Sequence, residues 1–308
     1  MTESAADYRK YLDPRTLARV ASIDLRARLI VEGLMSGMHR SPYQGASVEF
    51  AQHRPYVAGD DIRRVDWKVL GKTDRVYLKQ YLEETNLQLI LVVDASESMG
   101  YGSVKGDGNT TWTKYDHATA LAASLAYMAI QQGDSVGLAI FDQALSRYFK
   151  PSNSPGQWKT VINELQQIPR WNKTNTGKIL GQIAEKATHR SLIVLLSDFF
   201  DDLDGIQKGL RHLRYKKHEL MAFQILDPAE IEFPFEDVTM FKGLEESGEL
   251  LTEPRALRAG YLEQLSLFTE QFKKMCRGMH IDFTRLNSGE SLEVPLSSFL
   301  ATRAASMK

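Results

Sequence analysis

Short apolar runs alternate with amphipathic segments along most of the chain from residue 87 onward. The run Leu87–Val93 is too short for a helix and, apart from Gln88, has no polar alternation, which is typical of a strand buried on both faces. The same pattern predicts strands at Val136–Phe141, Leu145–Phe149, Ser191–Leu196, Glu219–Leu226 and Ile281–Leu286, a hairpin of Thr239–Leu244 with Glu249–Thr252, and helices at Lys114–Gln132, Trp158–Ile168, Gly177–Ala187, Leu203–Lys217, Ala256–Cys276 and Val294–Ala305. Strands that alternate with helices predict an α/β fold with a mostly parallel central sheet flanked by helices.

The first 84 residues follow a different pattern and are predicted to form an extension packed on that sheet. A helix is expected over Asp13–Met38, because an aspartate suits the N-cap and Pro14 suits the first turn. Two short strand candidates, Ser47–Phe50 and Val76–Tyr81, follow it. We therefore expect three parts: an extension of one helix and short strands at residues 1–84, an α/β domain at 85–290 and a C-terminal helix at 291–308.

Composition and charge are those of an ordinary soluble globular protein. Of the 308 residues, 43% are hydrophobic and 25% charged, and a net charge of -1 gives no general attraction to nucleic acid or to an anionic membrane. Scattered histidines and a single cysteine, Cys276, argue against a zinc site and a disulfide framework. The polar N-terminus differs from a signal peptide, and the longest apolar helical stretch, Ala118–Ile130, is shorter than the ~20 residues of a membrane span. A cytoplasmic location without membrane insertion is expected.

Oxygen-bearing side chains gather where the predicted central strands end. Asp94, Ser96 and Ser98 directly follow the first of these strands, and Asp198 follows the strand at Ser191–Leu196. Another loop, at residues 173–177, supplies a threonine just before a helix. Because ligands bind at the carboxyl ends of parallel strands, we expect the three loops to meet at one edge of the sheet. Carboxylates and hydroxyls suit Mg²⁺ or Mn²⁺, with a coordination position left open for a carboxylate of another molecule.

Three other interpretations of these residues are weighed against a metal site. A phosphohydrolase of the haloacid dehalogenase type also has an aspartate at the end of its first strand, but it needs an acidic residue two positions on, where this chain has Ser96. A nucleotide-binding loop is disfavoured because the glycines after the first strand lack the GxGxxG spacing. The simplest interpretation makes Asp94 and Asp198 helix caps without a ligand.

A dense cluster of charged and aromatic residues lies between the strand candidates of the extension. Arg63, Arg64, Asp66 and Trp67 follow a turn-rich centre at residues 58–61. One interpretation is catalytic, with the aspartate as a base and an arginine as an anion clamp. We favour a buried network of ion pairs and aromatic rings that docks one segment on another, since buried charges are usually paired.

The three loops together resemble the metal-ion-dependent adhesion site of von Willebrand factor A domains. The stretches that carry the resemblance are DASES, TNTG and SD, in the order of that family's DxSxS, T and D pattern. The resemblance covers about residues 87–286 and implies a Rossmann-like von Willebrand factor A fold. The metal ligands that it implies are Asp94, Ser96, Ser98, Thr174 and Asp198, with Thr176 as the substitute for Thr174.

The segment before the first central strand resembles a bacterial family catalogued as domain of unknown function fifty-eight. Many members have N-terminal membrane spans, which we do not expect in this chain, and such proteins are typically encoded beside MoxR-type AAA+ ATPases. The motif positions are Arg54, Tyr56, Gly59, Asp60, Asp61, Ile62, Arg63, Asp66, Trp67, Glu83 or Glu84, and Lys114-Tyr115-Asp116.

The resemblances imply a function in recognition rather than catalysis. The expected protein is a non-enzymatic, Mg²⁺- or Mn²⁺-dependent interaction module that serves a MoxR-type AAA+ ATPase and an unidentified client protein as an adaptor or chaperone partner. An acidic residue of a partner would complete the metal coordination, and no nucleic-acid partner is expected. The alternative is a Mg²⁺-dependent phosphohydrolase that uses Asp94 at the end of the first strand.

Overall fold

The structure is a computed structural model, and its secondary structure falls in two units. The described residues are 13–20, 22–38, 53–55, 71, 76–79, 87–106, 110–167, 175–236, 239–242, 249–252 and 254–306. One unit contains those between 13 and 37 together with those from 87 onward, and the other contains those between 38 and 86. The predicted part boundaries at 84 and 290 stay a prediction.

A six-stranded sheet with the order β12-β9-β8-β3-β6-β7 forms the centre of the larger unit. Its strands are β3 (Gln88–Asp94), β6 (Ser135–Phe141), β7 (Leu145–Ser152), β8 (Leu192–Ser197), β9 (Glu219–Leu226) and β12 (Asp282–Asn287). All neighbours pair in parallel except β7, which runs antiparallel to β6 at one edge. The strand β3 lies between β8 and β6 and is buried from Leu89 to Asp94. The predicted mostly parallel sheet and its buried first strand are therefore confirmed, and the strand predicted at Leu145–Phe149 is present as the antiparallel β7.

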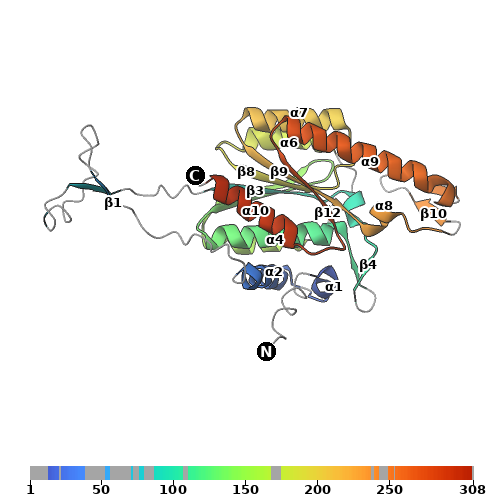
Figure 1. Cartoon of the computed structure of the whole chain (residues 1–308), viewed down its shortest axis with the longest axis horizontal. Helices are drawn as coiled ribbons and strands as arrows, with labels where there is room; N and C mark the ends of the chain where they lie inside the picture. The colour runs from blue at the N-terminus through green and yellow to red at the C-terminus, as the bar shows by residue number, and fades with distance from the viewer. Residues whose placement is uncertain are drawn as a thin grey trace. The chain divides into compact units, whose positions relative to one another are not determined.

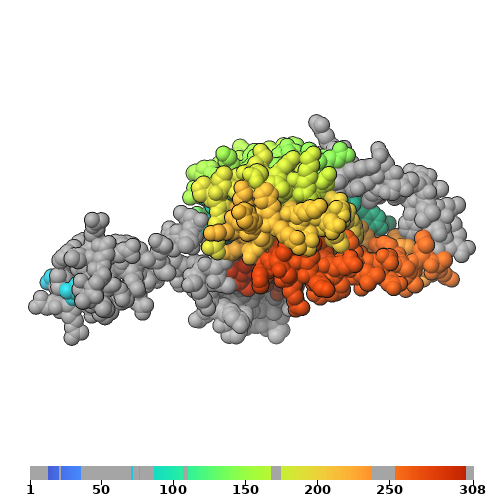
Figure 2. Space-filling view, turned by 90° about the horizontal axis from the view of Figure 1, so that it is seen from above, coloured from blue at the N-terminus to red at the C-terminus, as the bar shows by residue number. Residues whose placement is uncertain are grey.

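Helices cover both faces of this sheet (Figure 1). On one face lie α4 (Lys114–Gln131), which contacts α5 (Gln157–Leu165), and α10 (Glu293–Ser306). On the other face lie α6 (Thr176–Lys186), α7 (Leu203–Tyr215) and α9 (Pro254–Gly278), whose apolar side chains form one core with those of β3, β6, β8 and β9. Figure 2 shows α9, in orange, lying along α7, in yellow. Each predicted helix of the α/β part is present within a few residues of its expected bounds.

The helix expected over Asp13–Met38 is wrong as a single element, because the chain breaks it into α1 (Pro14–Leu17) and α2 (Ile23–Met38). The side chain of Asp13 caps α1, where Oδ1 accepts the N–H of Arg15 at 2.8 Å, and Pro14 opens the helix as expected. After the break, Nε1 of Trp158 donates to Oδ1 of Asp24 at 2.7 Å, which attaches α2 to α5. Tertiary contacts of this kind outweigh the continuous helical pattern of the sequence.

Four short elements were not expected from the apolar pattern. They are the 3₁₀ helix η3 (Glu97–Gly100), the antiparallel pair β4 (Val104–Lys105) and β5 (Thr111–Trp112), and the short helix α8 (Pro228–Glu232). Gly102 lies where the chain passes Trp112 so closely that a Cβ atom would be 2.3 Å from the Trp112 carbonyl oxygen. Gly102 thus permits a close backbone crossing.

The remaining strands pair as two-stranded antiparallel sheets. The strand β10 (Thr239–Lys242) pairs with β11 (Glu249–Thr252), as the predicted hairpin requires. In the smaller unit β1 (His53–Pro55) pairs with β2 (Tyr77–Lys79), which falls inside the second strand candidate. The first candidate, Ser47–Phe50, lies outside the described residues. No helix among the described residues is both long enough and apolar enough to cross a membrane.

Close packing of α6 against α7 fixes the spacing of two loops at the carboxyl end of the sheet. A Cβ atom on Gly177, in the first turn of α6, would lie 2.4 Å from the backbone carbon of Gly205 in α7. A Cβ atom on Gly209, one turn later in α7, would lie 2.6 Å from the Cβ of Leu180. Glycine at these positions lets the backbones of the two helices come into contact. The loops that precede the two helices are thereby held beside each other.

Candidate metal site at the carboxyl ends of the central strands

Asp94 is the last residue of β3, and its carboxylate is fully buried. The backbone N–H of Ser96 donates to its Oδ1 at 2.9 Å, and the hydroxyl of Ser197 donates to its Oδ2 at 2.5 Å. Burial, followed by the negative charge of Asp198, raises the pKa of Asp94 to about 7. The effect of the Asp198 charge on the pKa of Asp94 indicates that the ends of β3 and β8 bring these two carboxylates near each other, as the topology predicts.

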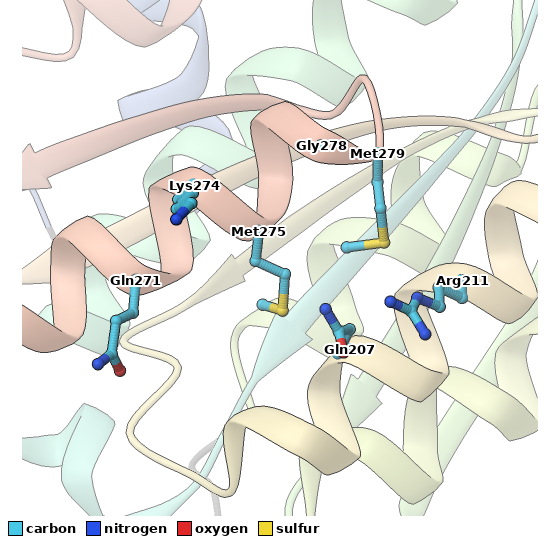
Figure 3. Close-up of a pocket in the computed structure, with 7 residues that line it drawn as sticks. All are labelled: Gln207, Arg211, Gln271, Lys274, Met275, Gly278 and Met279. Carbon is cyan, nitrogen blue, oxygen red and sulfur yellow. The ribbon is translucent and has the colours of Figure 1, made fainter.

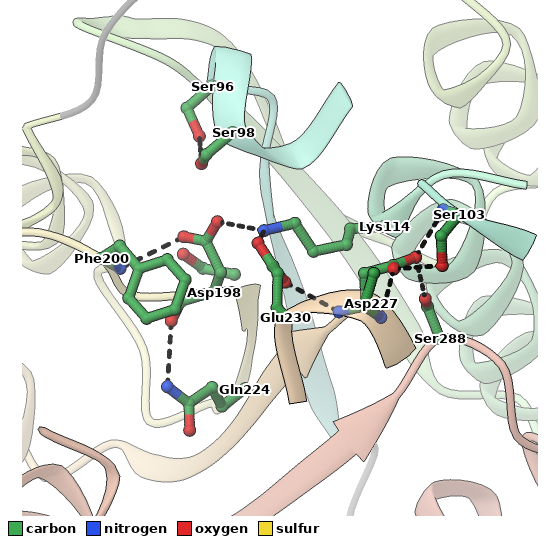
Figure 4. A network of polar contacts seen from close by, with 12 residues as sticks. Ser96, Ser98, Ser103, Lys114, Asp198, Phe200, Gln224, Asp227, Glu230 and Ser288 are labelled. Atoms are coloured by element: carbon green, nitrogen blue, oxygen red, sulfur yellow. Dashed lines mark hydrogen bonds and ion pairs between the residues drawn. The ribbon is translucent and has the colours of Figure 1, made fainter. Parts of the chain in front are cut away.

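Two serine hydroxyls follow Asp94 at alternate positions. Ser96 is buried and Ser98 is half-buried, and their Oγ atoms lie 3.1 Å apart. The 3₁₀ helix η3 begins directly after Ser96 and turns the chain so that the hydroxyls of both serines point toward Asp198 (Figure 4). The DxSxS segment therefore presents one carboxylate and a pair of hydroxyls at one point of the sheet edge.

Asp198 follows β8, and its carboxylate accepts two hydrogen bonds. Its Oδ2 accepts the ammonium of Lys114 at 2.8 Å, and its Oδ1 accepts the backbone N–H of Phe200 at 3.2 Å. The next residue, Phe199, has a φ of 60°, which is a genuine outlier for a bulky side chain. Its ring stacks on Phe272 of α9 with a centroid distance of 4.6 Å. Burial of that ring retains the strained backbone, and strain of this kind gathers at functional sites.

Lys114 is the first residue of α4, and its side chain is 0% exposed. Its ammonium lies between two carboxylates, 2.8 Å from Asp198 and 2.7 Å from Oε1 of Glu230 (Figure 4). Burial alone lowers the pKa of Lys114, but the two carboxylates outweigh it and raise the pKa above its ordinary value. Lys114 is therefore a permanent cation of the site.

Glu230 and Asp227 belong to a capping box at the start of α8. The backbone N–H of Asp227 donates to Oε2 of Glu230 at 2.8 Å, which leaves Oε1 for Lys114. The carboxylate of Asp227 accepts the N–H of Ser103 at 2.9 Å and the hydroxyl of Ser288 at 3.3 Å. Polar contacts thus run from the end of β8 through α4 and α8 to the loops that follow β3 and β12 (Figure 4).

The loop that was predicted to supply a threonine is described only from Asn175 onward, so Thr174 lies outside the described residues. The substitute, Thr176, is buried at the start of α6. Its backbone N–H donates to Oδ2 of Asp201 at 2.6 Å, and Asp201 is three residues past Asp198. The loop before α6 and the loop after β8 are therefore joined by a hydrogen bond. The Asn175 side chain caps α6 by accepting the N–H of Lys178 at 3.3 Å.

Most of the predicted docking motif in the extension is outside the described residues. Arg54 is in β1, opposite Leu78 of β2. The other positions, Tyr56, Gly59, Asp60, Asp61, Arg63, Asp66 and Trp67, lie outside the described residues. Their role as a docking motif stays a prediction.

The donor set fits a hard divalent cation better than zinc. Among the residues that the structure describes, no group of three or more His, Cys, Asp or Glu could hold a metal ion. Mg²⁺ often binds through one or two carboxylates and several waters, and hydroxyls suit it as well. Within the same described part of the chain, Asp94 has hydrogen-bond donors but no ion pair. A buried carboxylate beside a second one, without a cation of its own, favours a metal ion.

A pocket of about 360 Å³ lies elsewhere, between α7 and α9 (Figure 3). Gln207 and Arg211 line the pocket on the side of α7. On the other side it is lined by Gln271 and Met275 of α9 and by Met279, which directly follows that helix. None of the predicted metal ligands lines it. The candidate chemistry is therefore at the sheet edge, where buried charges converge, and not at this groove.

Sequence reasoning missed the role of Lys114 and the presence of Glu230 in the cluster. Lys114 belongs to one of the motif positions that resemble the family, but it was not expected to be buried or to bind Asp198. The signal for Glu230 was local, since Asp227, Pro228 and Glu230 have the spacing of a capped helix start. Neither residue directly follows a strand, and the site was predicted only from side chains at strand ends.

Fold and site define an α/β protein with a mostly parallel sheet and an oxygen-rich cluster at the carboxyl ends of its central strands. The chain belongs to the family described as protein of unknown function DUF58, whose family model matches residues 52–267. Uncharacterized proteins of Mycobacterium bovis and Mycobacterium tuberculosis are 24% identical to it over 297 residues, covering 94% of this chain and 90% of each relative.

Two solved structures from Bacteroides are similar over most of their own length. The conserved hypothetical protein BatB of Bacteroides thetaiotaomicron is 14% identical with a TM-score of 0.46, covering 71% of this chain and 99% of that chain. An aerotolerance-related membrane protein of Bacteroides fragilis is 14% identical with a TM-score of 0.44, covering 69% of this chain and 97% of that chain.

Proposed function

We propose that the chain is a cytoplasmic, metal-dependent protein–protein interaction module with a von Willebrand factor A-like fold. In this proposal Mg²⁺ or Mn²⁺ binds at Asp94, Ser96, Ser98, Thr174 and Asp198, partly through water. A carboxylate from a partner protein occupies the remaining coordination position. The partner is a MoxR-type AAA+ ATPase, for which the chain acts as an adaptor toward a client protein, and the chain itself makes and breaks no covalent bond.

The observation that carries this proposal is the pair of buried carboxylates at the ends of β3 and β8. Asp94 is fully buried, and its pKa is raised to about 7 by that burial and by the charge of Asp198. Ionised carboxylates are costly to bury unless they are paired or coordinate a metal. Helix capping explains neither residue. The N-cap of η3, which follows Asp94, is Ser96, α4 is capped by Thr113, and α7, which follows Asp198, is capped by Asp202.

The order of the two aspartates along the chain supports the same proposal. Asp94 ends β3, which is first in the chain among the strands of the six-stranded sheet, and Asp198 follows β8, which is fourth. This is the order that the von Willebrand factor A pattern requires of its first and last aspartates. The absence of an acidic residue at position 96 disfavours the phosphohydrolase alternative, because no general acid follows Asp94 at the needed distance.

A binding experiment with two kinds of readout tests the proposal. The purified full-length chain is immobilised and incubated with a lysate of its source organism, in Mg²⁺ or in EDTA, and retained proteins are identified by mass spectrometry. The variants are Asp94→Ala and, as a control for loss of an exposed aspartate, Asp282→Ala. Hydrolysis of p-nitrophenyl phosphate by the same preparations is followed in parallel.

We expect an AAA+ ATPase to be retained by the wild type and by Asp282→Ala in Mg²⁺, and to be lost in EDTA and with Asp94→Ala. Retention that is indifferent to EDTA and to Asp94→Ala would contradict the metal-dependent adaptor. Phosphate ester hydrolysis that Asp94→Ala abolishes would instead establish the phosphohydrolase.

A further inference from the structure

Lys114 occupies a position that is unfavourable for a lysine on two grounds. It is the first residue of α4, where the helix dipole favours negative rather than positive side chains. It is also completely buried, which is rare for lysine unless the charge is paired. A residue that breaks two local rules at once indicates a function that the rest of the fold supports.

The ammonium of Lys114 is held between two carboxylates that belong to different elements of the fold. Asp198 holds it at 2.8 Å from the end of β8, and Glu230 holds it at 2.7 Å from the first turn of α8. The start of α4 is locked by a capping box of Thr113 and Asp116, and Glu230 is locked by the N–H of Asp227. The pair Lys114–Glu230 is therefore a rigid part of the site.

With all three carboxylates ionised, as metal binding requires, the pair of Lys114 and Glu230 determines the charge of the cluster. Asp94 and Asp198 bring two negative charges, and Glu230 brings a third, of which Lys114 neutralises one. The formal charge of the four groups is therefore −2, which one divalent cation neutralises. The neighbouring carboxylate of Asp227 is not part of this count, and it accepts hydrogen bonds from the N–H groups of Ser103 and Ala229 and from the hydroxyl of Ser288.

We propose that Lys114 and Glu230 are positioning residues that set the charge of the metal site to that of a divalent ion. Lys114 also fixes the orientation of Asp198 by binding its Oδ2, while Oδ1 accepts the N–H of Phe200. This inference rests on the proposed metal site and assigns a role to two residues outside its ligand set. Neither residue contacts the ion, and both act on it through charge and through the orientation of Asp198.

The proposal predicts metal affinities that change in opposite directions. Glu230→Gln leaves a formal charge of −1 and weakens Mn²⁺ binding at least about tenfold, since attraction in a poorly solvated site is strong. Lys114→Met leaves −3 and strengthens Mn²⁺ binding by a similar factor. The double variant Lys114→Met/Glu230→Gln returns the charge to −2 and binds Mn²⁺ within about threefold of the wild type.

The experiment measures Mn²⁺ dissociation constants by isothermal titration calorimetry on the full-length chain. Matched controls are Lys159→Met and Glu263→Gln, which remove one exposed charge of each sign away from the site. Circular dichroism checks that each variant is folded. Because Lys114→Met alone leaves both Asp198 and Glu230 without their ammonium, the decision rests on two other variants. Glu230→Gln keeps the pair of Lys114 with Asp198, and the double variant leaves only Asp198 without its partner.

Weakening by Glu230→Gln together with recovery in the double variant, and no change in the controls, supports the proposal. Equal affinity of the wild type, Glu230→Gln and the double variant overturns it, and so does weakening in both without recovery. Failure of the proposed function gives a different result, since the wild type and Asp94→Ala would then both bind no Mn²⁺ or bind it equally.

Discussion

The two ends of the central sheet hold charged side chains in opposite ways. At the carboxyl end, Lys114 and Asp198 form an ion pair whose side chains are 0% and 1% exposed. At the amino end, between the starts of β8 and β9, Arg190 pairs with Glu219 and their side chains are 73% and 29% exposed. The ends of β8 and β9 thus differ, with a buried ion pair at the carboxyl end of β8 and an exposed ion pair between their amino ends.

The difference matters because burial changes what a charge contributes. An exposed ion pair is worth about 0–1 kcal/mol, whereas each ion in a buried pair has a desolvation penalty of several kcal/mol. A fold that needed only stability would gain as much from apolar residues at Lys114 and Asp198. The buried cluster is therefore evidence for a role in binding, while the pair at the amino end requires no such role.

The largest expected effect comes from removing the buried cation. Lys114→Ala leaves Asp198 and Glu230 buried without their common partner, so the free energy of unfolding should fall by about 3–5 kcal/mol. Urea denaturation followed by circular dichroism measures it. A loss below about 1 kcal/mol would show that the carboxyl end is as tolerant as the surface.

Asp94 gives the carboxyl end a pH dependence in the absence of metal. Its pKa in the folded chain is about 7 against an ordinary value of 3.8, so between these values the native state retains a proton that the unfolded chain releases. The free energy of unfolding in EDTA should therefore fall by a few kcal/mol as the pH rises from about 4 to about 7. Asp94→Asn, which cannot ionise, should remove most of that slope. An identical slope in both proteins would contradict the raised pKa.

Alanine substitutions at two glycines of α6 distinguish the effect of close helix packing from that of helix propensity. Gly177→Ala places a Cβ atom 2.4 Å from the backbone of Gly205, so we expect a loss of about 1–3 kcal/mol in the free energy of unfolding. Gly181→Ala, in the same helix, meets nothing within 4 Å and should raise stability by roughly 0.5–1 kcal/mol. Thermal unfolding of the two variants compares them, and changes of the same sign would refute the close α6–α7 contact.

The smallest effect is expected at the amino end of the sheet. Arg190→Ala removes an exposed ion pair with Glu219 and should change the free energy of unfolding by less than about 1 kcal/mol. The change should shrink further in 1 M salt, where the Debye length is about 3 Å. A loss as large as that of Lys114→Ala would erase the contrast between the two ends.

The apolar pattern was sufficient to predict the sheet and the positions of the two aspartates at the ends of its central strands. Runs such as Leu87–Val93 have an unambiguous period, and parallel strands bring their carboxyl ends to one edge, so Asp94 and Asp198 could be placed near each other in advance. The helix break after Leu17 was not predictable, because the contact of Asp24 with Trp158 that accompanies it is tertiary.

The charge balance of the site could not be read from the sequence for the same reason. A lysine at the start of a helix is ordinarily a surface residue, and only the folded chain brings Lys114 to Asp198, 84 positions away, and to Glu230, 116 positions away. The capped start of α8 can be recognised from the local sequence, but nothing near Glu230 in the sequence indicates that it binds Lys114.

The central claim is that the buried carboxylates at the ends of β3 and β8 hold a divalent cation. Its most direct test is calorimetric titration of Mn²⁺ into the metal-free wild type and into Asp94→Ala. We predict one Mn²⁺ bound per chain by the wild type and none by Asp94→Ala. Absence of binding to the wild type, or equal binding by the two proteins, would contradict the account.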